Sequence, residues 1–366
     1  MSRLPIVCTD TDAELPDFRA EADPIPLAAR GTTGFPGWLA DRHGRRLRYL
    51  RLSVTDRCDL TCRYCMPPEG VPASPRGEFM CFEEIVRSVK TFRRLGVETV
   101  RLTGGEPLVR KGIEDLVKMI RDEAGITDIA MTTNASALAK KAPTLAENGL
   151  RRINVSLDSL NADRFRHMTR GGDLDRVLAG IQAAQDAGLP VKTNAVVVRG
   201  HNEGDLAELV EWAWRRDITP RFIELMPLGE GAKLGRDAVV SVKEMKARLA
   251  HLVEPEAEPE YRTDRGPAGY LVAKDGSGRK VGFIGAVTDN FCHRCNRVRV
   301  TARGEIRACL ASPSGFSLRD ALREGHGDDS LVRLVEDALF GKRHGHEFYV
   351  DGVTRHHAVD MSRIGG

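Results

Sequence analysis

The sequence has no long apolar run and few aromatic residues. No segment reaches the roughly 18 to 20 apolar residues that a membrane-spanning helix needs, and the amino terminus lacks the apolar core of a signal peptide. Neither charge sign dominates, because 55 Lys and Arg stand against 52 Asp and Glu, for a net charge of +3. These absences predict a globular cytoplasmic protein with neither a membrane nor nucleic acid as its partner.

Six of the eight cysteines fall into two groups of three. Thiols stay reduced in the cytoplasm, and a group of three cannot pair internally, so both groups are more typical of metal ligands than of disulfides. Cys8 and Cys81 lie outside both groups and receive no predicted role.

The first cysteine trio is Cys58, Cys62 and Cys65, in a C-x-x-x-C-x-x-C segment. Three thiolates in a short loop can bind three irons of a 4Fe-4S cluster and leave the fourth iron open. S-adenosylmethionine (SAM) can chelate that iron, so that an electron from the cluster cleaves the sulfonium bond. Structural zinc is the alternative, but zinc usually takes four ligands, and the loop offers no fourth cysteine or histidine. Tyr64, just before the third cysteine, is expected to cover the cluster or the adenine.

Strand-like and helical segments alternate from Arg48 onward. The strand-like runs are 49–54, 97–102, 128–132, 152–157, 191–198 and 221–225, and the main helical stretches are 82–95, 113–123, 177–187 and 206–216. Six alternations predict an α/β fold with a parallel sheet, in the form of a partial, six-stranded TIM-like barrel. Its active site should lie at the carboxyl ends of the strands.

Composition divides the chain into three parts. Residues 1–40 are rich in proline and acidic side chains without periodicity, which predicts a mobile extension. Residues 41–255 carry the predicted barrel, and the acidic segment 254–260 has the composition of a linker. Residues 256–366 hold a predicted helix at 331–340, three further cysteines and a Gly-Gly end, and they form a smaller predicted C-terminal iron-sulfur module.

A Gly104-Gly105-Glu106-Pro107 segment follows the second strand-like run. Its glycines are expected to let the backbone approach a bound amino acid moiety closely. Alone, such a segment is usually a turn. Combined with the first cysteine trio one strand away, it resembles the radical SAM superfamily, and the resemblance covers roughly residues 45–240.

The second cysteine trio is Cys292, Cys295 and Cys309. Two interpretations stay open, namely a second 4Fe-4S cluster with an open iron for substrate, or an electron-transfer cluster completed by a distant ligand. His293 is expected to face solvent and not to be that ligand. Arg297 and Arg299 alternate on the strand-like segment that follows, so both guanidinium groups should leave one face and suit phosphate oxygens. The chain has no G-x-x-x-x-G-K-S/T loop that could hold phosphates instead.

Five segments and the Gly-Gly end resemble the GTP 3′,8-cyclases, the MoaA family of molybdenum cofactor biosynthesis, from about Leu39 to the last residue. The segments are 49–58, 101–108, 154–158, 222–227 and 291–297. The resemblance implies two 4Fe-4S clusters, SAM and GTP. It also implies the reaction, in which a 5′-deoxyadenosyl radical removes the ribose 3′ hydrogen and the carbon radical adds to guanine C8. The product would be (8S)-3′,8-cyclo-7,8-dihydroguanosine 5′-triphosphate, in the first step of molybdopterin biosynthesis.

The resemblance also implies roles for individual residues. It implies that the two cysteine trios bind the clusters and that Gly365 and Gly366 reach into the active site. The residues implied to contact SAM are Tyr64, Gly105, Ser156 and Met226. Those implied to contact GTP are Arg51, Arg101, Thr132, Lys192, Arg297 and Arg299, with Arg221 as a further candidate. Two positions depart from the family pattern. Asp59 stands where asparagine is common, and Ala135 stands where a Thr-Thr-Asn-Gly segment has glycine.

The family resemblance leaves partners and two other functions to consider. It implies an electron donor of unspecified kind, a downstream cyclic pyranopterin monophosphate synthase, and a homodimer as a possible assembly. One alternative function is a radical SAM enzyme that modifies a peptide and carries an auxiliary cluster. The other is a zinc-stabilised module that binds nucleic acid through two arginine patches beside the cysteine trios. The patches are Arg42, Arg45, Arg46, Arg48 and Arg51, and Arg294, Arg297, Arg299, Arg303 and Arg307.

Overall fold

The computed structural model describes residues 38–72, 74–254, 266–311, 315–346, 348–350, 353–354 and 361–365. The predicted extension 1–40 lies almost entirely outside the described residues, as do most of the predicted linker and Gly366.

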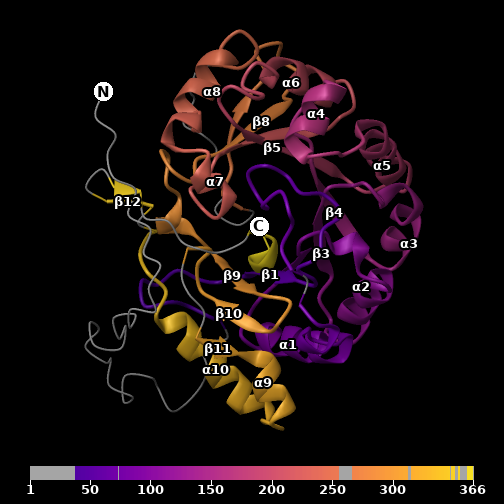
Figure 1. The fold of residues 1–366 in the computed structure, drawn as a ribbon. Coiled ribbons are helices and arrows are strands. Elements are labelled where there is room, and N and C mark those ends of the chain that lie inside the picture. The colour runs from indigo at the N-terminus through magenta and orange to yellow at the C-terminus, as the bar shows by residue number, and fades with distance from the viewer. Residues whose placement is uncertain are drawn as a thin grey trace.

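Six parallel strands alternating with helices form the centre of the molecule (Figure 1). The elements are β1 (Tyr49–Ser53), α1 (Phe82–Arg94), β2 (Thr99–Thr103), α2 (Ile113–Asp122), β3 (Asp128–Thr133), α3 (Ala142–Glu147), β4 (Leu150–Ser156), α4 (Ala162–Thr169), α5 (Leu174–Asp186), β5 (Val191–Val197), α6 (Leu206–Trp214) and β6 (Thr219–Glu224). Strands β1 to β6 are neighbours in chain order and all pair in parallel. The predicted six-stranded α/β core is confirmed.

The carboxy-terminal third extends the same sheet at both edges. Its elements are α7 (Glu230–Lys233), α8 (Val242–Arg248), β7 (Gly269–Val272), β8 (Lys280–Ile284), β9 (Arg297–Val300), β10 (Glu305–Arg307), β11 (Phe316–Ser317), α9 (Leu318–Arg323), α10 (Asp328–Phe340), β12 (Tyr349–Val350), β13 (Val353–Thr354) and α11 (Met361–Ile364). Strand β8 pairs in parallel with β6, and β9 pairs in parallel with β1. The sheet of eleven strands runs β11-β10-β9-β1-β2-β3-β4-β5-β6-β8-β7 and does not close. The division into a barrel and a carboxy-terminal module stays a prediction.

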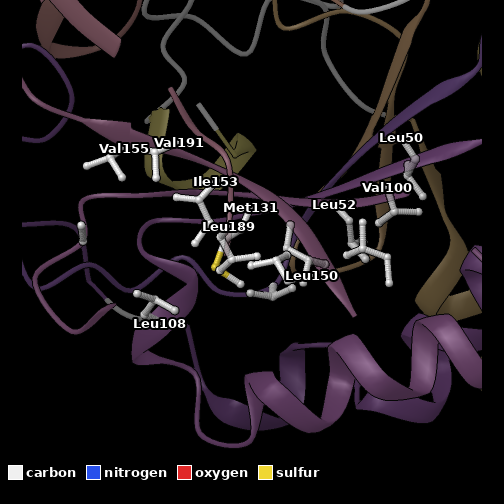
Figure 2. Packing of buried hydrophobic residues seen from close by; sticks show 14 of the residues in the cluster. Leu50, Leu52, Val100, Leu108, Met131, Leu150, Ile153, Val155, Leu189 and Val191 are labelled. Atoms are coloured by element: carbon white, nitrogen blue, oxygen red, sulfur yellow. The ribbon is translucent and has the colours of Figure 1, made fainter. Parts of the chain in front are cut away.

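Each central strand separates an apolar outer face from a more polar inner face. In β5 the odd-numbered residues from Val191 to Val197 are buried, whereas Lys192, Asn194 and Val196 are only partly buried. Because successive side chains leave opposite faces of a strand, the odd positions pack outward against helices. Figure 2 shows part of this packing, with side chains of the strands such as Leu50 and Met131 in the apolar cluster. The inner face therefore carries the polar side chains that are available to form an active site.

The helices cover the outside of the sheet and one short helix enters its interior. Figure 1 shows α1 to α5 as an outer arc, with α9 and α10 beside α1, while the terminal helix α11 lies near β1 at the centre. Cys81 is the N-cap of α1, where its sulfur accepts from the Glu84 backbone N–H at 3.4 Å. Within the described ranges, no helix is long and apolar enough to cross a membrane.

Candidate active site

One cavity of about 310 Å³ on the inner face of the sheet is lined by residues of both cysteine trios. Nearly all residues that the family resemblance implied also line it: Tyr64, Gly105, Ser156, Met226, Arg51, Arg101, Thr132, Arg221, Arg297 and Arg299. Lys192 is not among the lining residues, and its Nζ lies 3.4 Å from the hydroxyl of Tyr270 and over that ring. Gly366 lies outside the described residues.

The first cysteine trio lies on the loop that follows β1, and two backbone hydrogen bonds hold this loop against the end of β2. Gly105 N–H donates to Thr55 O and Glu106 N–H donates to Arg57 O, both at 2.8 Å. A Cβ on Gly105 would lie 2.3 Å from Arg57 O, and one on Gly104 would lie 2.6 Å from Thr55 O. The glycines therefore make room for the backbone of the cysteine loop, a reason that the sequence interpretation, which assigned the space to a ligand, had missed.

Carboxylates surround the first cysteine trio. Burial raises the pKa of Cys58 to about 12, and the charges of Glu106 and Asp59 add to that rise. Burial also raises the pKa of Cys62 well above its ordinary value, with Asp158 as the strongest neighbouring charge. These thiols favour the neutral form in the bare protein, so a metal must displace their protons.

Two buried carboxylates in this region were not singled out by sequence. Glu106 accepts from the hydroxyl of Thr133 at 2.7 Å and from the Asn134 N–H at 2.6 Å, and burial raises its pKa to about 7. Asp158 accepts from the Tyr64 hydroxyl at 2.8 Å, and burial raises its pKa to about 6. Glu106 lies within a motif that sequence had identified, but only the structure shows where its carboxylate bonds.

Both departures from the family pattern lie beside the first cysteine trio. The Asn134 side-chain amide donates to Asp59 Oδ1 at 2.7 Å and approaches Cys58 Sγ at 4.0 Å, and the Ser136 hydroxyl donates to Asp59 Oδ2. Ala135 has a φ of 63°, in the left-handed region where glycine is favoured. The turn is thus kept with alanine in place of glycine.

The second cysteine trio lies at the opposite end of the cavity from the first. Cys295 lies two residues before the start of β9, and Cys309 lies two residues after the end of β10, which is antiparallel to β9 with Arg299 opposite Arg307. Because β9 and β1 are parallel, the amino end of β9 is far from the loop that follows β1. The two trios therefore lie on either side of the strand residues that line the middle of the cavity.

Cations surround the second cysteine trio. Burial by itself would raise the pKa of Cys295, but the charges of Arg297 and Lys342 outweigh it and hold this pKa at about 6. Arg45 donates to the Cys292 carbonyl oxygen at 2.6 Å, and it is paired with Asp41 at 2.6 Å. His293 is exposed, as the sequence predicted. Lys342 and Arg45 belong to no motif, and sequence reasoning missed their roles.

A row of arginines crosses three adjacent strands between the two trios. In the parallel register Arg51 of β1 lies beside Arg299 of β9 on one side and Arg101 of β2 on the other. Burial and these two neighbours lower the pKa of Arg51 well below its ordinary value. Burial and Arg297 lower the pKa of Arg299 to about 9. Like charges packed this closely favour a bound anion.

The carboxy-terminal tail reaches this arginine row. Gly365 O accepts from Arg299 Nη1 at 2.6 Å and from Arg51 Nη2 at 3.2 Å. A Cβ at Gly365 would lie 2.4 Å from Thr103 Oγ1, and its φ of +69° is in the region that favours glycine. Only glycine fits here without a shift of the tail or of Thr103.

Two family models match the chain in succession. The Radical SAM superfamily matches residues 52–213, and Molybdenum Cofactor Synthesis C matches residues 218–348. A GTP 3′,8-cyclase of Pelotomaculum thermopropionicum is 43% identical over 90% of this chain and 100% of its own length. The chain belongs to the GTP 3′,8-cyclase family. Cyclases of Alkaliphilus oremlandii, at 40% identity, and Brucella ovis, at 42%, also match 90% of this chain, with 100% and 96% of their own lengths covered.

Solved structures of other enzymes share the fold of this GTP 3′,8-cyclase family member. SuiB of Streptococcus suis bound to S-adenosylmethionine matches with a TM-score of 0.57 at 18% identity, over 82% of this chain and 68% of that chain. The structure described as native anSMEcpe with bound AdoMet matches with a TM-score of 0.52 at 14% identity, over 80% and 82%. At these identities the likeness shows the fold alone, and the cyclase relatives outweigh the peptide-modifying and nucleic-acid alternatives.

Proposed function

We propose that the chain converts GTP to (8S)-3′,8-cyclo-7,8-dihydroguanosine 5′-triphosphate, the first step of molybdopterin biosynthesis. The observation that carries the proposal is the row of Arg299, Arg51 and Arg101 between two cysteine trios in one cavity. A triphosphate offers the anionic oxygens that such a row favours, because guanidinium groups bind phosphate through forked hydrogen bonds. The cyclase relatives at 40% to 43% identity support the choice of GTP.

The first cysteine trio fits a 4Fe-4S cluster that also binds SAM. Its three thiols form no disulfide and lie on a loop fixed by its bonds to Gly105 and Glu106. Across the described part of the chain, no three His, Cys, Asp or Glu side chains converge as a single metal ion requires. Structural zinc usually takes four ligands, and the loop offers only these three thiols, so the trio favours a cluster over structural zinc. When bound, the cluster and SAM supply a 5′-deoxyadenosyl radical that removes the ribose 3′ hydrogen atom.

The proposed SAM contacts are Tyr64, Gly105, Ser156 and Met226. The bond from Tyr64 to Asp158 fixes the tyrosine ring in the cavity wall, where an aromatic face suits an adenine. Gly105 is tied to the cysteine loop by its N–H bond to Thr55 O and lines the same cavity.

The second cysteine trio is proposed to hold a second 4Fe-4S cluster with an open iron turned to the guanine. Cys292, Cys295 and Cys309 all line the cavity that contains the arginine row. Three thiolates leave one iron without a protein ligand, as at the first trio. The open-iron interpretation is preferred because the vacancy would face the proposed substrate.

Arg51, Arg101, Thr132, Lys192, Arg297 and Arg299 are proposed to contact GTP, together with Arg221. Arg221 is buried, and its Nε and Nη2 have no hydrogen-bond partner in the described structure. Buried donors are normally satisfied, so these two favour a phosphate oxygen as their partner. For Lys192 to contact GTP, its ammonium group must leave Tyr270.

The tail and outside partners complete the proposal. The Gly365 carbonyl already occupies one donor of Arg51 and one of Arg299, which holds both guanidinium groups beside the cavity. A site closed to water during the reaction would protect a radical. The reaction further needs an external electron donor, and the product would pass to a cyclic pyranopterin monophosphate synthase.

The test is anaerobic reconstitution of the full chain with iron and sulfide, followed by incubation with SAM, dithionite and GTP. We expect about eight irons per chain, formation of 5′-deoxyadenosine, and a cyclised GTP detected by mass spectrometry. GDP and ATP serve as matched substrates, and both should give less product.

Three other outcomes would overturn the proposal. Formation of 5′-deoxyadenosine without consumption of GTP would favour a peptide substrate. A colourless protein that retains zinc and no iron would favour the nucleic-acid-binding alternative. Equal turnover of ATP and GTP would contradict the assignment of a guanine.

A further inference from the structure

Lys342 is a buried lysine that points at a predicted cluster ligand. Its residue is only 2% exposed, and its Nζ lies 3.8 Å from Cys295 Sγ. The same Nζ donates to the backbone carbonyl oxygen of Arg297. A buried ammonium is retained only where other groups compensate for its lost hydration. The Cys295 sulfur and the Arg297 carbonyl oxygen supply that compensation for Lys342.

The chain fixes Lys342 from both sides. On one side its backbone N–H donates to Leu339 O at 3.0 Å, at the end of α10, whose Leu331, Val335 and Leu339 are fully buried. On the other side Arg45 donates to the carbonyl oxygens of the next two residues, at 2.6 and 2.9 Å. The direction of the side chain is thus set by the fold and not by its contact with the thiol alone.

The first cysteine trio has the opposite surroundings. Apart from other thiols, the charged groups that act most strongly on Cys58 and Cys62 are the carboxylates of Glu106, Asp59 and Asp158. At Cys295 the strongest are Arg297 and Lys342. Of these two cations, Lys342 approaches from behind the cysteine without lining the cavity, so it is separate from the proposed GTP contacts.

We propose that Lys342 raises the reduction potential of the second cluster by donating an N–H bond to the Cys295 sulfur. This inference rests on the second cluster put forward under the proposed function. A reduced cluster carries one more negative charge than an oxidised cluster, so a donor and a positive charge at its thiolate stabilise the reduced form more. Lys342 therefore makes the second cluster easier to reduce, and it acts through Cys295 as a positioning residue.

The test compares the full-length wild-type protein with Lys342→Met, both reconstituted anaerobically and titrated with reductant under EPR. In Lys342→Met the ratio of reduced to oxidised second cluster should fall about tenfold at a fixed applied potential, which is a shift of about 59 mV for one electron. The first cluster, identified by the change of its signal on addition of SAM, should keep its ratio. Lys342→Gln retains an N–H donor and should show a smaller fall.

Lys90→Met is the matched control, because it removes a lysine charge from the half-exposed pair with Glu123. Its titration should coincide with that of the wild type. Coincident titrations of wild type and Lys342→Met, with about eight irons in each, would overturn the role of Lys342. About four irons in the wild type itself would instead overturn the second cluster. If Lys342→Met loses the second cluster, the titration of Lys342→Gln becomes the test. A ratio of reduced to oxidised second cluster in Lys342→Gln equal to that of the wild type would contradict the inference.

Discussion

The two cysteine trios offer the same three thiols but lie in opposite electrostatic surroundings. Burial raises the pKa of Cys58 to about 12 and the charges of Glu106 and Asp59 add to that rise, while Asp158 acts in the same direction on Cys62. Arg297 and Lys342 act on the second trio, and the pKa of Cys295 falls to about 6. Carboxylates near a cluster oppose its reduction and cations favour it. Two trios with the same three ligands should therefore hold clusters that differ in how easily they are reduced.

The largest expected effect comes from substitution of one cysteine in each trio, because the two variants should lose different products. Cys58→Ser should lower 5′-deoxyadenosine formation by more than about a thousandfold, because an incomplete first cluster cannot reduce SAM. Cys295→Ser should retain 5′-deoxyadenosine formation but lose the cyclised product. Both compounds can be measured by liquid chromatography and mass spectrometry.

Cys81→Ser is the control for these two variants, since Cys81 caps α1 outside both trios and serine is a good N-cap. It should keep its iron content and activity. An equal loss of 5′-deoxyadenosine in Cys58→Ser and Cys295→Ser would end the assignment of separate tasks.

The second effect concerns the arginine row between the trios. Arg299→Ala removes a charged donor that is worth roughly 1.5–3 kcal/mol, so KM for GTP should rise about 10- to 100-fold. SAM cleavage in the absence of GTP should change little. Arg303→Ala, on the same hairpin but 42% exposed and paired with Glu78, should leave KM unaltered. A similar rise of KM in both variants would mean that general charge, and not the row, binds the substrate.

The third effect concerns the tail that contacts this row. Gly365→Ala places a Cβ 2.4 Å from Thr103 Oγ1 in a left-handed conformation, with roughly 1–2 kcal/mol of strain. We expect kcat/KM for GTP to fall about tenfold. Gly341→Ala is the control, because its Cβ would meet nothing within 4 Å. Addition of Thr103→Ala should restore part of the loss, and no restoration would contradict a steric cause.

The fourth effect tests the carboxylate side of the comparison through pH. Folding raises the pKa of Glu106 from 4.5 to about 7, so the folded protein binds this proton more tightly. The free energy of unfolding should therefore fall as pH rises through that interval, by about 1 kcal/mol per pH unit near pH 5.5. Urea unfolding of the metal-free protein at pH 5 and 6 measures the slope. Glu106→Gln should flatten it, although Asp158 contributes in the same direction, and an unchanged slope would exclude Glu106 as its source.

The smallest effect concerns Asp59, where asparagine is common in the family. Asp59→Asn removes one negative charge near Cys58, but Asp59 is exposed, and screening keeps such effects small. The ratio of reduced to oxidised first cluster at a fixed potential should rise by no more than about threefold. A redox titration with Asp122→Asn as a surface control measures it, and a tenfold rise would show that Asp59 is poorly screened.

Sequence predicted those features that depend on local spacing. Short strand-like runs that alternate with helical segments identified the six central strands, and the spacing of the cysteines identified both trios. The alternation of Arg297 and Arg299 placed them on one face, and both line the cavity. Each of these patterns is complete within a few residues of the chain.

Sequence could not predict what depends on contacts between distant segments. The pairing of β9 with β1 joins Arg299 to Arg51, and no local pattern specifies that pairing. Lys342 follows a helix with no unusual sequence feature, and its proposed role depends on its contact with Cys295, which is distant in the sequence. The glycine segment after β2 has the same letters whether or not another backbone segment packs against it, and only the structure shows Gly104 and Gly105 against the backbone at Thr55 and Arg57.

The central place of β1 in the sheet has a consequence for synthesis of the chain. One edge of β1 pairs with β2 soon after both strands have left the ribosome, but the other edge must wait for β9, which begins at Arg297. Until then an apolar strand in the middle of the future sheet has free N–H and C=O groups, which invite pairing with other chains. A protein shortened before β9 would therefore be expected to aggregate as well as to lack Cys309, without which the second cysteine trio is incomplete.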